Sequence, residues 1–298
     1  MSLTRKVWRL IDSGREKPGL NMAIDEAILR AVIEKRVPPT LRFYSWESFS
    51  VSLGYFQRVE GIDTEFCARE GISLVRRPTG GRAILHGDEL TYSFSCTYED
   101  FSGEIGGEVT VGLYEIYRAI SECFVNALKR QGLPVTMERR KRVRYGHNPL
   151  CFMSSSFGEI TLSGVKVIGS AQKRLREGFL QQGSMPYSIN NDLIKRVFKR
   201  GDGPLLFGLR DICRERGLEV PDPDETKTLI KEEFEKRFNI RFIKDELSDY
   251  ELDLARARLQ LYEISPQSNI SDVRNQISES KGKFISQNRT PKLPTFSV

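Results

Sequence analysis

The stretch Arg76-Arg-Pro-Thr-Gly-Gly-Arg-Ala-Ile-Leu-His86 lies between two predicted strands. An apolar run at 72–75 precedes it, and residues 90–96 follow it with apolar and small polar side chains in alternation, the period of a half-buried strand. Gly80 and Gly81 allow the backbone to turn sharply and to approach a ligand closely. We therefore expect a loop here whose successive backbone amides can hold an anion.

Basic side chains surround the two glycines. Arg76, Arg77 and Arg82 carry planar guanidinium groups that suit phosphate or carboxylate. His86 is one of only 2 histidines in the chain. A basic surface hairpin without a ligand explains the same residues, so the stretch alone leaves both interpretations open.

Length and composition indicate a globular protein with a substantial core. The chain has 298 residues, enough for one large domain or for one domain with a small appendage. Its formal net charge is +6, but the basic residues are dispersed among 40 acidic ones. Because no run of aromatic and arginine side chains resembles a stacking platform, we expect no nucleic-acid partner. The positive excess suits an acidic protein partner or an anionic substrate equally well.

The number and spacing of the cysteines and histidines indicate the redox compartment of the protein and whether it holds a metal ion. The 5 cysteines have no regular spacing, which favours a reducing compartment over a disulfide framework. With no CxxC motif and only 2 histidines, we expect no metal site. The first residues lack the apolar core of a signal peptide, and no run of 18 apolar residues occurs. We therefore expect a soluble, cytoplasmic protein with no membrane partner.

The remaining pattern alternates strands and helices. Strands are expected at 7–11, 41–46, 50–54 and 181–186, and helices at 20–33, 62–70, 111–131, 226–238 and 247–262. The Gly- and Glu-rich residues 101–109 are expected to form a loop. The basic run 139–144 suits a solvated loop or edge strand, or a contact with an acidic carrier protein or a nucleotide.

Residues 157–171 predict a hairpin that carries one lysine. Ser163-Gly164 lies between two short strands, with glycine where positive φ is easiest. Lys166 projects from the strand face opposite Val165 and Val167, a place where lysines are usually exposed to solvent. The small residues Gly169-Ser-Ala171 follow and allow a ligand to approach the strand closely.

Three motifs occur together in one order: the 76–86 stretch, Lys166-Val-Ile-Gly-Ser-Ala171 and Gln181-Gln-Gly-Ser184. In this combination the sequence resembles the lipoate-protein ligase and octanoyltransferase family, whose distant relatives are the biotin protein ligases. The resemblance implies an α+β fold of mixed, mainly antiparallel sheets flanked by helices. It also implies a catalytic domain at 1–203 and a small helical extension at 204–262. Residues 263–298 depart from the family pattern, and their many Ser, Asn, Gln and Lys residues indicate a flexible tail or a segment that lies along the surface.

The same resemblance assigns roles to residues. It implies that Lys166 contacts the acyl carbonyl or acyl phosphate, and that the acyl group is transferred to a lysine of a small lipoyl-accepting carrier protein. That carrier would be the H protein of glycine cleavage or the lipoyl domain of a dehydrogenase. The implied substrate-binding residues are Arg76, Arg77, Gly80, Gly81, Arg82, His86, Gly169, Ser170 and Ala171.

Two chemistries exist within this family. Cys151 is similar to the nucleophile of the cysteine-type octanoyltransferases, which take the chain from acyl carrier protein through a thioester and need no cofactor. A nearby Lys166 would lower the pKa of such a thiol. The alternative is an ATP- and magnesium-dependent lipoate-protein ligase that works through lipoyl-AMP, with Cys151 in a structural role. A third class, a non-catalytic ligand-sensing protein, is disfavoured by the pairing of Cys151 with Lys166.

Overall fold

The computed structural model describes residues 5–105, 112–138, 159–199 and 204–264. Its centre is an eight-stranded sheet in the order β11-β1-β2-β6-β10-β9-β8-β7, beside a three-stranded sheet in the order β4-β3-β5. The strands are β1 (Lys6–Glu16), β2 (Thr40–Trp46), β3 (Ser50–Leu53), β4 (Ser73–Arg76), β5 (Ile84–His86), β6 (Glu89–Thr97), β7 (Val135–Met137), β8 (Ile160–Leu162), β9 (Val165–Arg174), β10 (Gly178–Pro186) and β11 (Ile240–Lys244). The parallel pairs are β1–β11, β1–β2 and β3–β4, and antiparallel pairs make up the rest. The predicted fold class is confirmed.

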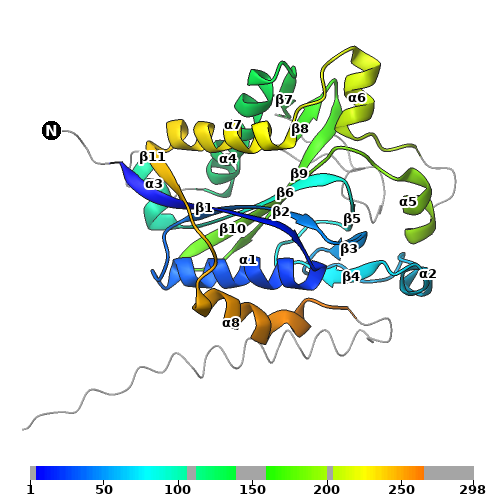
Figure 1. Ribbon diagram of the computed structural model, residues 1–298, viewed down its shortest axis with the longest axis horizontal. Coiled ribbons are helices and arrows are strands. Elements are labelled where there is room, and N and C mark those ends of the chain that lie inside the picture. Colours follow the sequence, from blue (N-terminus) through cyan, green and yellow to red (C-terminus); the bar gives the residue numbers. More distant parts are fainter. Residues whose placement is uncertain (1–4, 106–111, 139–158, 200–203, 265–298) are drawn as a thin grey trace, which may run out of the picture.

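Helices cover both faces of the large sheet (Figure 1). They are α1 (Pro18–Ile33), α2 (Thr64–Arg69), α3 (Tyr98–Ile105), α4 (Leu113–Arg130), α5 (Asn191–Val197), α6 (Leu209–Arg216), α7 (Pro223–Arg237) and α8 (Asp249–Arg258), followed by the short 3-10 turn η2 (Leu259–Leu261). Helix α1 lies against one face with α8 outside it, while α4 and α7 lie on the opposite face. None of the helices in the described ranges is long and apolar enough to cross a membrane.

Helix α1 is buried on nearly all sides because it lies between the sheet and α8. Pro18 occupies the first turn, where a missing N–H costs nothing. Thirteen of the helix residues are buried, so its sequence shows an apolar stripe less clearly than a surface helix would. This position places the side chains of α1 directly over strands β2, β6 and β10.

The core on the α4 and α7 side is built from aromatic rings that pack in tilted and edge-on arrangements. Trp8 of β1 lies 5.4 Å from Phe94 of β6 and 5.3 Å from Phe238, measured between ring centroids. Phe234 of α7 lies 5.3 Å from Phe94 in an edge-on arrangement. Each such buried ring contributes on the order of 2 kcal/mol of hydrophobic free energy. The chain beyond residue 204 therefore shares one core with the N-terminal strands, and its treatment as a separate extension stays a prediction.

Several local expectations were wrong for a shared reason. Residues 101–105 belong to α3 instead of a loop, and β6 is buried on both faces instead of one. The C-terminal part, predicted as helical throughout, contributes the edge strand β11, which pairs in parallel with β1. In each case the neighbouring elements supply partners or burial that a local pattern does not contain.

The predicted turn at Ser163-Gly164 is confirmed, with φ of 51° and 80°.

Candidate functional site

A pocket lies on the α1 face of the large sheet, where the small sheet approaches it. The empty space in the pocket and at its mouth amounts to about 430 Å³, a figure that includes open solvent. Its walls come from α1, β2, β3, the 77–86 segment, β6, β9 and β10. The lining residues are Met22, Tyr44, Trp46, Ser52, Arg77, Gly81, Ile84, His86, Thr91, Gly169, Ser170, Ala171, Gln182, Gly183 and Ser184.

Six of the residues predicted from the sequence line this pocket together: Arg77, Gly81, His86, Gly169, Ser170 and Ala171. The other three from the 76–86 stretch lie beside it. The Nη1 atom of Arg76 donates to the backbone carbonyls of Gly54, Tyr55 and Gln57, so this arginine holds the loop after β3. Gly80 accepts from Arg77 through its carbonyl oxygen. Arg82 is partly exposed, and its buried Nη1 atom has no hydrogen-bond partner among the described residues.

The Gly-Gly loop closes tightly over its own arginine. Arg77 donates from Nη2 to the carbonyls of Gly80 and Arg82, at 2.8 and 2.7 Å. Gly81 adopts a φ of 92°, a region that favours glycine, and a Cβ there would lie 2.9 Å from Arg77 Nη2. Gly54, which was not predicted, is equally constrained, because a Cβ there would lie 1.9 Å from the Gly81 carbonyl oxygen. The close contact between Gly54 and Gly81 therefore requires glycine at both positions.

A chain of polar groups runs through one end of the pocket. His86 Nδ1 lies 2.7 Å from Glu89 Oε1, and its Nε2 lies 2.7 Å from Ser52 Oγ. Ser52 Oγ also accepts from Arg77 Nη1 at 3.0 Å. The imidazole stacks on Trp46 with ring centroids 3.8 Å apart. Burial raises the pKa of Glu89, but attraction to His86 and hydrogen bonds from His86 and Thr91 outweigh it and lower the pKa overall.

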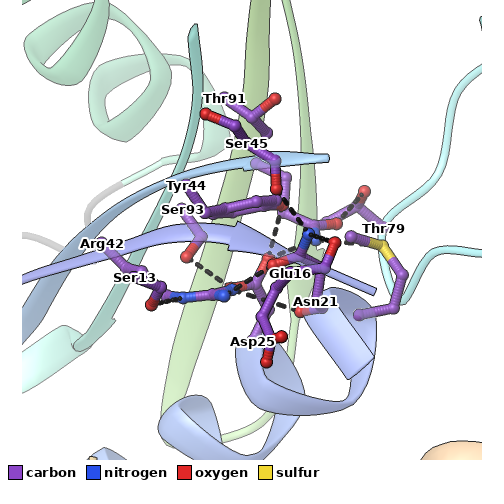
Figure 2. Close-up of polar contacts among 12 residues, drawn as sticks. Ser13, Glu16, Asn21, Asp25, Arg42, Tyr44, Ser45, Thr79, Thr91 and Ser93 are labelled. Carbon is purple, nitrogen blue, oxygen red and sulfur yellow. Dashed lines mark hydrogen bonds and ion pairs between the residues drawn. The ribbon is translucent and has the colours of Figure 1, made fainter. Parts of the chain in front are cut away.

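The floor of the pocket rests on a buried carboxylate that the sequence did not single out as part of a site. Asp25 accepts from Arg42 Nη1 at 2.8 Å and from Ser93 Oγ at 2.7 Å through Oδ1. Its Oδ2 accepts from Tyr44 at 2.9 Å and from Gln182 at 2.7 Å. Figure 2 shows Arg42, Tyr44 and Ser93 converging on Asp25 from the sheet. Because Tyr44 and Gln182 line the pocket, Asp25 fixes two of its walls.

A second carboxylate of α1 joins the pocket wall to the C-terminal helix. Glu26 pairs with Arg30 and Arg258 at 2.8 Å and with Lys173 at 3.5 Å, and it accepts a short hydrogen bond from Tyr262. Burial raises the pKa of Glu26, but the three cations outweigh burial and hold it far below its usual range. Lys173, Arg258 and Tyr262 follow Glu26 in the chain by 147, 232 and 236 positions.

Lys166 lies at the same end of the pocket as the histidine. It is buried in β9, where its ammonium donates to Glu159 Oε1 at 2.6 Å, so it departs from the solvent exposure that is usual for a lysine at such a position. Strand pairing sets Glu89 opposite Pro186, and Ser184 opposite both Thr91 and Gly169. Lys166 precedes Gly169 by three residues, and therefore lies beyond the Glu89 end of the pocket rather than beyond the Asp25 end.

The predicted features that lie wholly or partly outside the described residues include Cys151, the basic run 139–144, the end of the predicted loop at 106–109, and the predicted tail from residue 265 on. Within the described ranges, no three His, Cys, Asp or Glu side chains come together in a way that would hold a metal ion. Cys67, Cys96, Cys123 and Cys213 are all free and buried, as expected for packing residues.

A mostly apolar pocket on a mixed sheet, with a chain of polar groups at one end, is typical of a small-molecule-binding domain of the α+β type. Residues 17–235 match the family model of the lipoyl protein ligase A/B catalytic domain. The chain belongs to that family.

Relatives and solved structures agree with this assignment. Octanoyltransferase LipM of Anoxybacillus flavithermus is 35% identical over 264 residues, covering 84% of this chain and 93% of that protein. The LipM protein of Moorella thermoacetica is 44% identical over 197 residues, covering 65% of this chain and 70% of the relative. The bi-partite lipoate protein ligase of Thermoplasma acidophilum has a TM-score of 0.66 at 23% identity, over 86% of this chain and 92% of that one. A lipoate-protein ligase A bound with ATP has a TM-score of 0.65 at 23% identity, over 90% and 97%.

Proposed function

We propose that this protein is an octanoyltransferase that moves an octanoyl group onto a specific lysine of a lipoyl-accepting protein. The observation that carries the proposal is the pocket, whose mostly apolar walls suit an alkyl chain. The chain of polar groups Arg77, Ser52, His86 and Glu89 marks one of its ends. The LipM relatives, 31–35% identical over more than four fifths of this chain, support octanoyl as the group transferred.

We assign the carbonyl end of the acyl chain to the end of the pocket beyond which Lys166 lies. An ammonium group fixed at a strand end can stabilise negative charge that develops on an acyl oxygen. The alkyl tail then runs along β9 past Gly169 and Ala171 toward Met22 and Gln182. Arg77, Gly81 and His86 close the pocket from the side of the small sheet.

Cys151 is the proposed nucleophile. A thiolate exchanges readily with a thioester, and this accounts for transfer without ATP. In this scheme octanoyl-acyl carrier protein is the donor, and the acceptor is the glycine cleavage H protein or a dehydrogenase lipoyl domain. All of these partners are cytoplasmic, as we propose for this protein. The remaining predicted residues, Arg76, Gly80, Arg82 and Ser170, support or line the acyl site.

Intact-mass analysis tests the proposal. Purified protein with octanoyl-acyl carrier protein and no acceptor is expected to gain one octanoyl mass, and hydroxylamine is expected to remove it. Cys151→Ala should lose the adduct, and Lys166→Ala should slow transfer by about 10²-fold or more. If Cys151→Ala transfers lipoate at full rate when given ATP and magnesium, the protein is a ligase and the thioester route is wrong.

A further inference from the structure

Acyl transfer to lysine requires a base, and the pocket contains few groups that can serve. The acceptor ammonium must lose one proton before its nitrogen can attack. The C–N bond then forms, the C–S bond breaks, and the departing thiolate takes up the second proton that the nitrogen releases. Among the lining residues that the structure describes, Tyr44, Arg77 and His86 are titratable. Burial and the neighbouring Asp25 raise the pKa of Tyr44 well above its usual value, and arginine stays protonated.

We propose that Ser52 and His86 form a proton relay that accepts the proton of the acceptor lysine. This inference rests on the proposed octanoyl transfer. With Nδ1–H donated to Glu89, the Nε2 atom of neutral His86 accepts from the Ser52 hydroxyl, whose oxygen is 2.7 Å away. A hydroxyl oxygen has two acceptor positions, and Arg77 occupies one of them. The second position can accept from an ammonium in the pocket while the hydroxyl proton moves to Nε2.

The surroundings of His86 stabilise the imidazolium that this step produces. Glu89 contacts the ring directly, and attraction between its carboxylate and a charged His86 lowers the pKa of Glu89. Trp46 offers its ring face at 3.8 Å, which favours a cation. Arg77 opposes the new charge, and Ser52 lies between its Nη1 atom and the imidazole in the hydrogen-bonded chain. Glu89 is thus a positioning residue that selects the tautomer and balances the charge, as the acidic member does in other hydrogen-bonded triads.

The strand register places this relay where the reaction occurs. Glu89 and Thr91 lie opposite Pro186 and Ser184, at the pocket end beyond which Lys166 is found. The Asp25 network occupies the other end, beside Met22. An acyl chain with its carbonyl toward Lys166 therefore has its reactive carbon at the relay and its methyl end away from it.

The relay can be tested by comparing two acyl acceptors, one that must lose a proton before it attacks and one that does not. The lysine of a lipoyl-accepting domain is protonated at neutral pH, whereas hydroxylamine is already unprotonated and needs no base. His86→Gln should slow transfer to the domain by about 10²-fold or more, and should slow it far more than it slows enzyme-dependent octanoyl hydroxamate formation. The pH–rate profile for the domain should also lose its acidic limb in this variant.

Ser52→Ala gives an independent reading with little risk to folding, because the contacts of His86 with Glu89 and Trp46 remain. Its matched control is Ser50→Ala, a buried serine two residues earlier on β3 whose hydroxyl has no hydrogen-bond partner among the described residues. Equal loss of rate toward both acceptors in Ser52→Ala and His86→Gln would overturn the relay. If the wild type forms no hydroxamate and accepts no octanoyl group, it is the proposed function that fails instead.

Discussion

Replacing Asp25 by asparagine tests whether the pocket floor depends on a buried ion pair. Asp25 and Arg42 are both 0% exposed and are joined at 2.8 Å, and Asp25 accepts three further hydrogen bonds. Asparagine keeps the shape but removes the charge and turns one acceptor into a donor that faces other donors. Breaking a buried pair by removing one partner costs about 3–5 kcal/mol, because the remaining charge stays buried without compensation.

Urea denaturation, monitored by tryptophan fluorescence, measures this loss. We expect the free energy of unfolding to fall by about 3–5 kcal/mol, which corresponds to a melting temperature lower by on the order of 10 °C. The matched control is Asp12→Asn, which removes the more exposed pair with Lys227 at 2.8 Å and should cost less than about 1 kcal/mol. If Asp25→Asn unfolds with nearly the same free energy as Asp12→Asn, the network does not stabilise the fold as argued.

Two further predictions concern ionisation. The pKa of Glu26 is lowered in the folded state, so its contribution to stability is fully present above the unfolded glutamate pKa of about 4.3 and is lost as pH falls toward the folded value. Denaturation between about pH 6 and pH 3 should therefore show a shallower loss of stability in Glu26→Gln than in the wild type, and parallel curves would contradict this sign. Burial raises the pKa of all four described cysteines, to about 11 for Cys67, so none of them should react quickly with a thiol reagent at neutral pH. Native protein should then show no more than one fast thiol, and a second would mean that one of these four is accessible.

The sequence predicted the features that depend on a few neighbouring residues. Gly81 requires a positive φ and Ser163-Gly164 forms a two-residue turn, and both can be recognised locally. The small residues 169–171 line the pocket because a strand without large side chains leaves room for a ligand. These features needed no knowledge of the partner strands.

The buried carboxylates could not be predicted in this way. Asp25 looks like an ordinary acidic residue near a helix start, yet its partners come from β2, β6 and β10, up to 157 positions later. Lys166 looks exposed by strand alternation, but Glu159 on the other side of the hairpin compensates its charge and allows burial. The local sequence pattern shows whether a side chain is polar, but it does not show whether an oppositely charged partner lies next to that side chain in the fold.

The C-terminal helix belongs to the support of the pocket, although it lies far from it in sequence. Glu251 of α8 accepts two hydrogen bonds from Arg9 of β1, and both side chains are almost completely buried. Arg258, at the end of α8, pairs with Glu26, which lies one helical turn after the pocket residue Met22. Because a buried charge left alone is costly, each of these pairs fixes α8 against the sheet and against α1. The wall of the pocket is therefore held in position by residues that follow the last of the three sequence motifs, which ends at Ser184, by 67 and 74 positions.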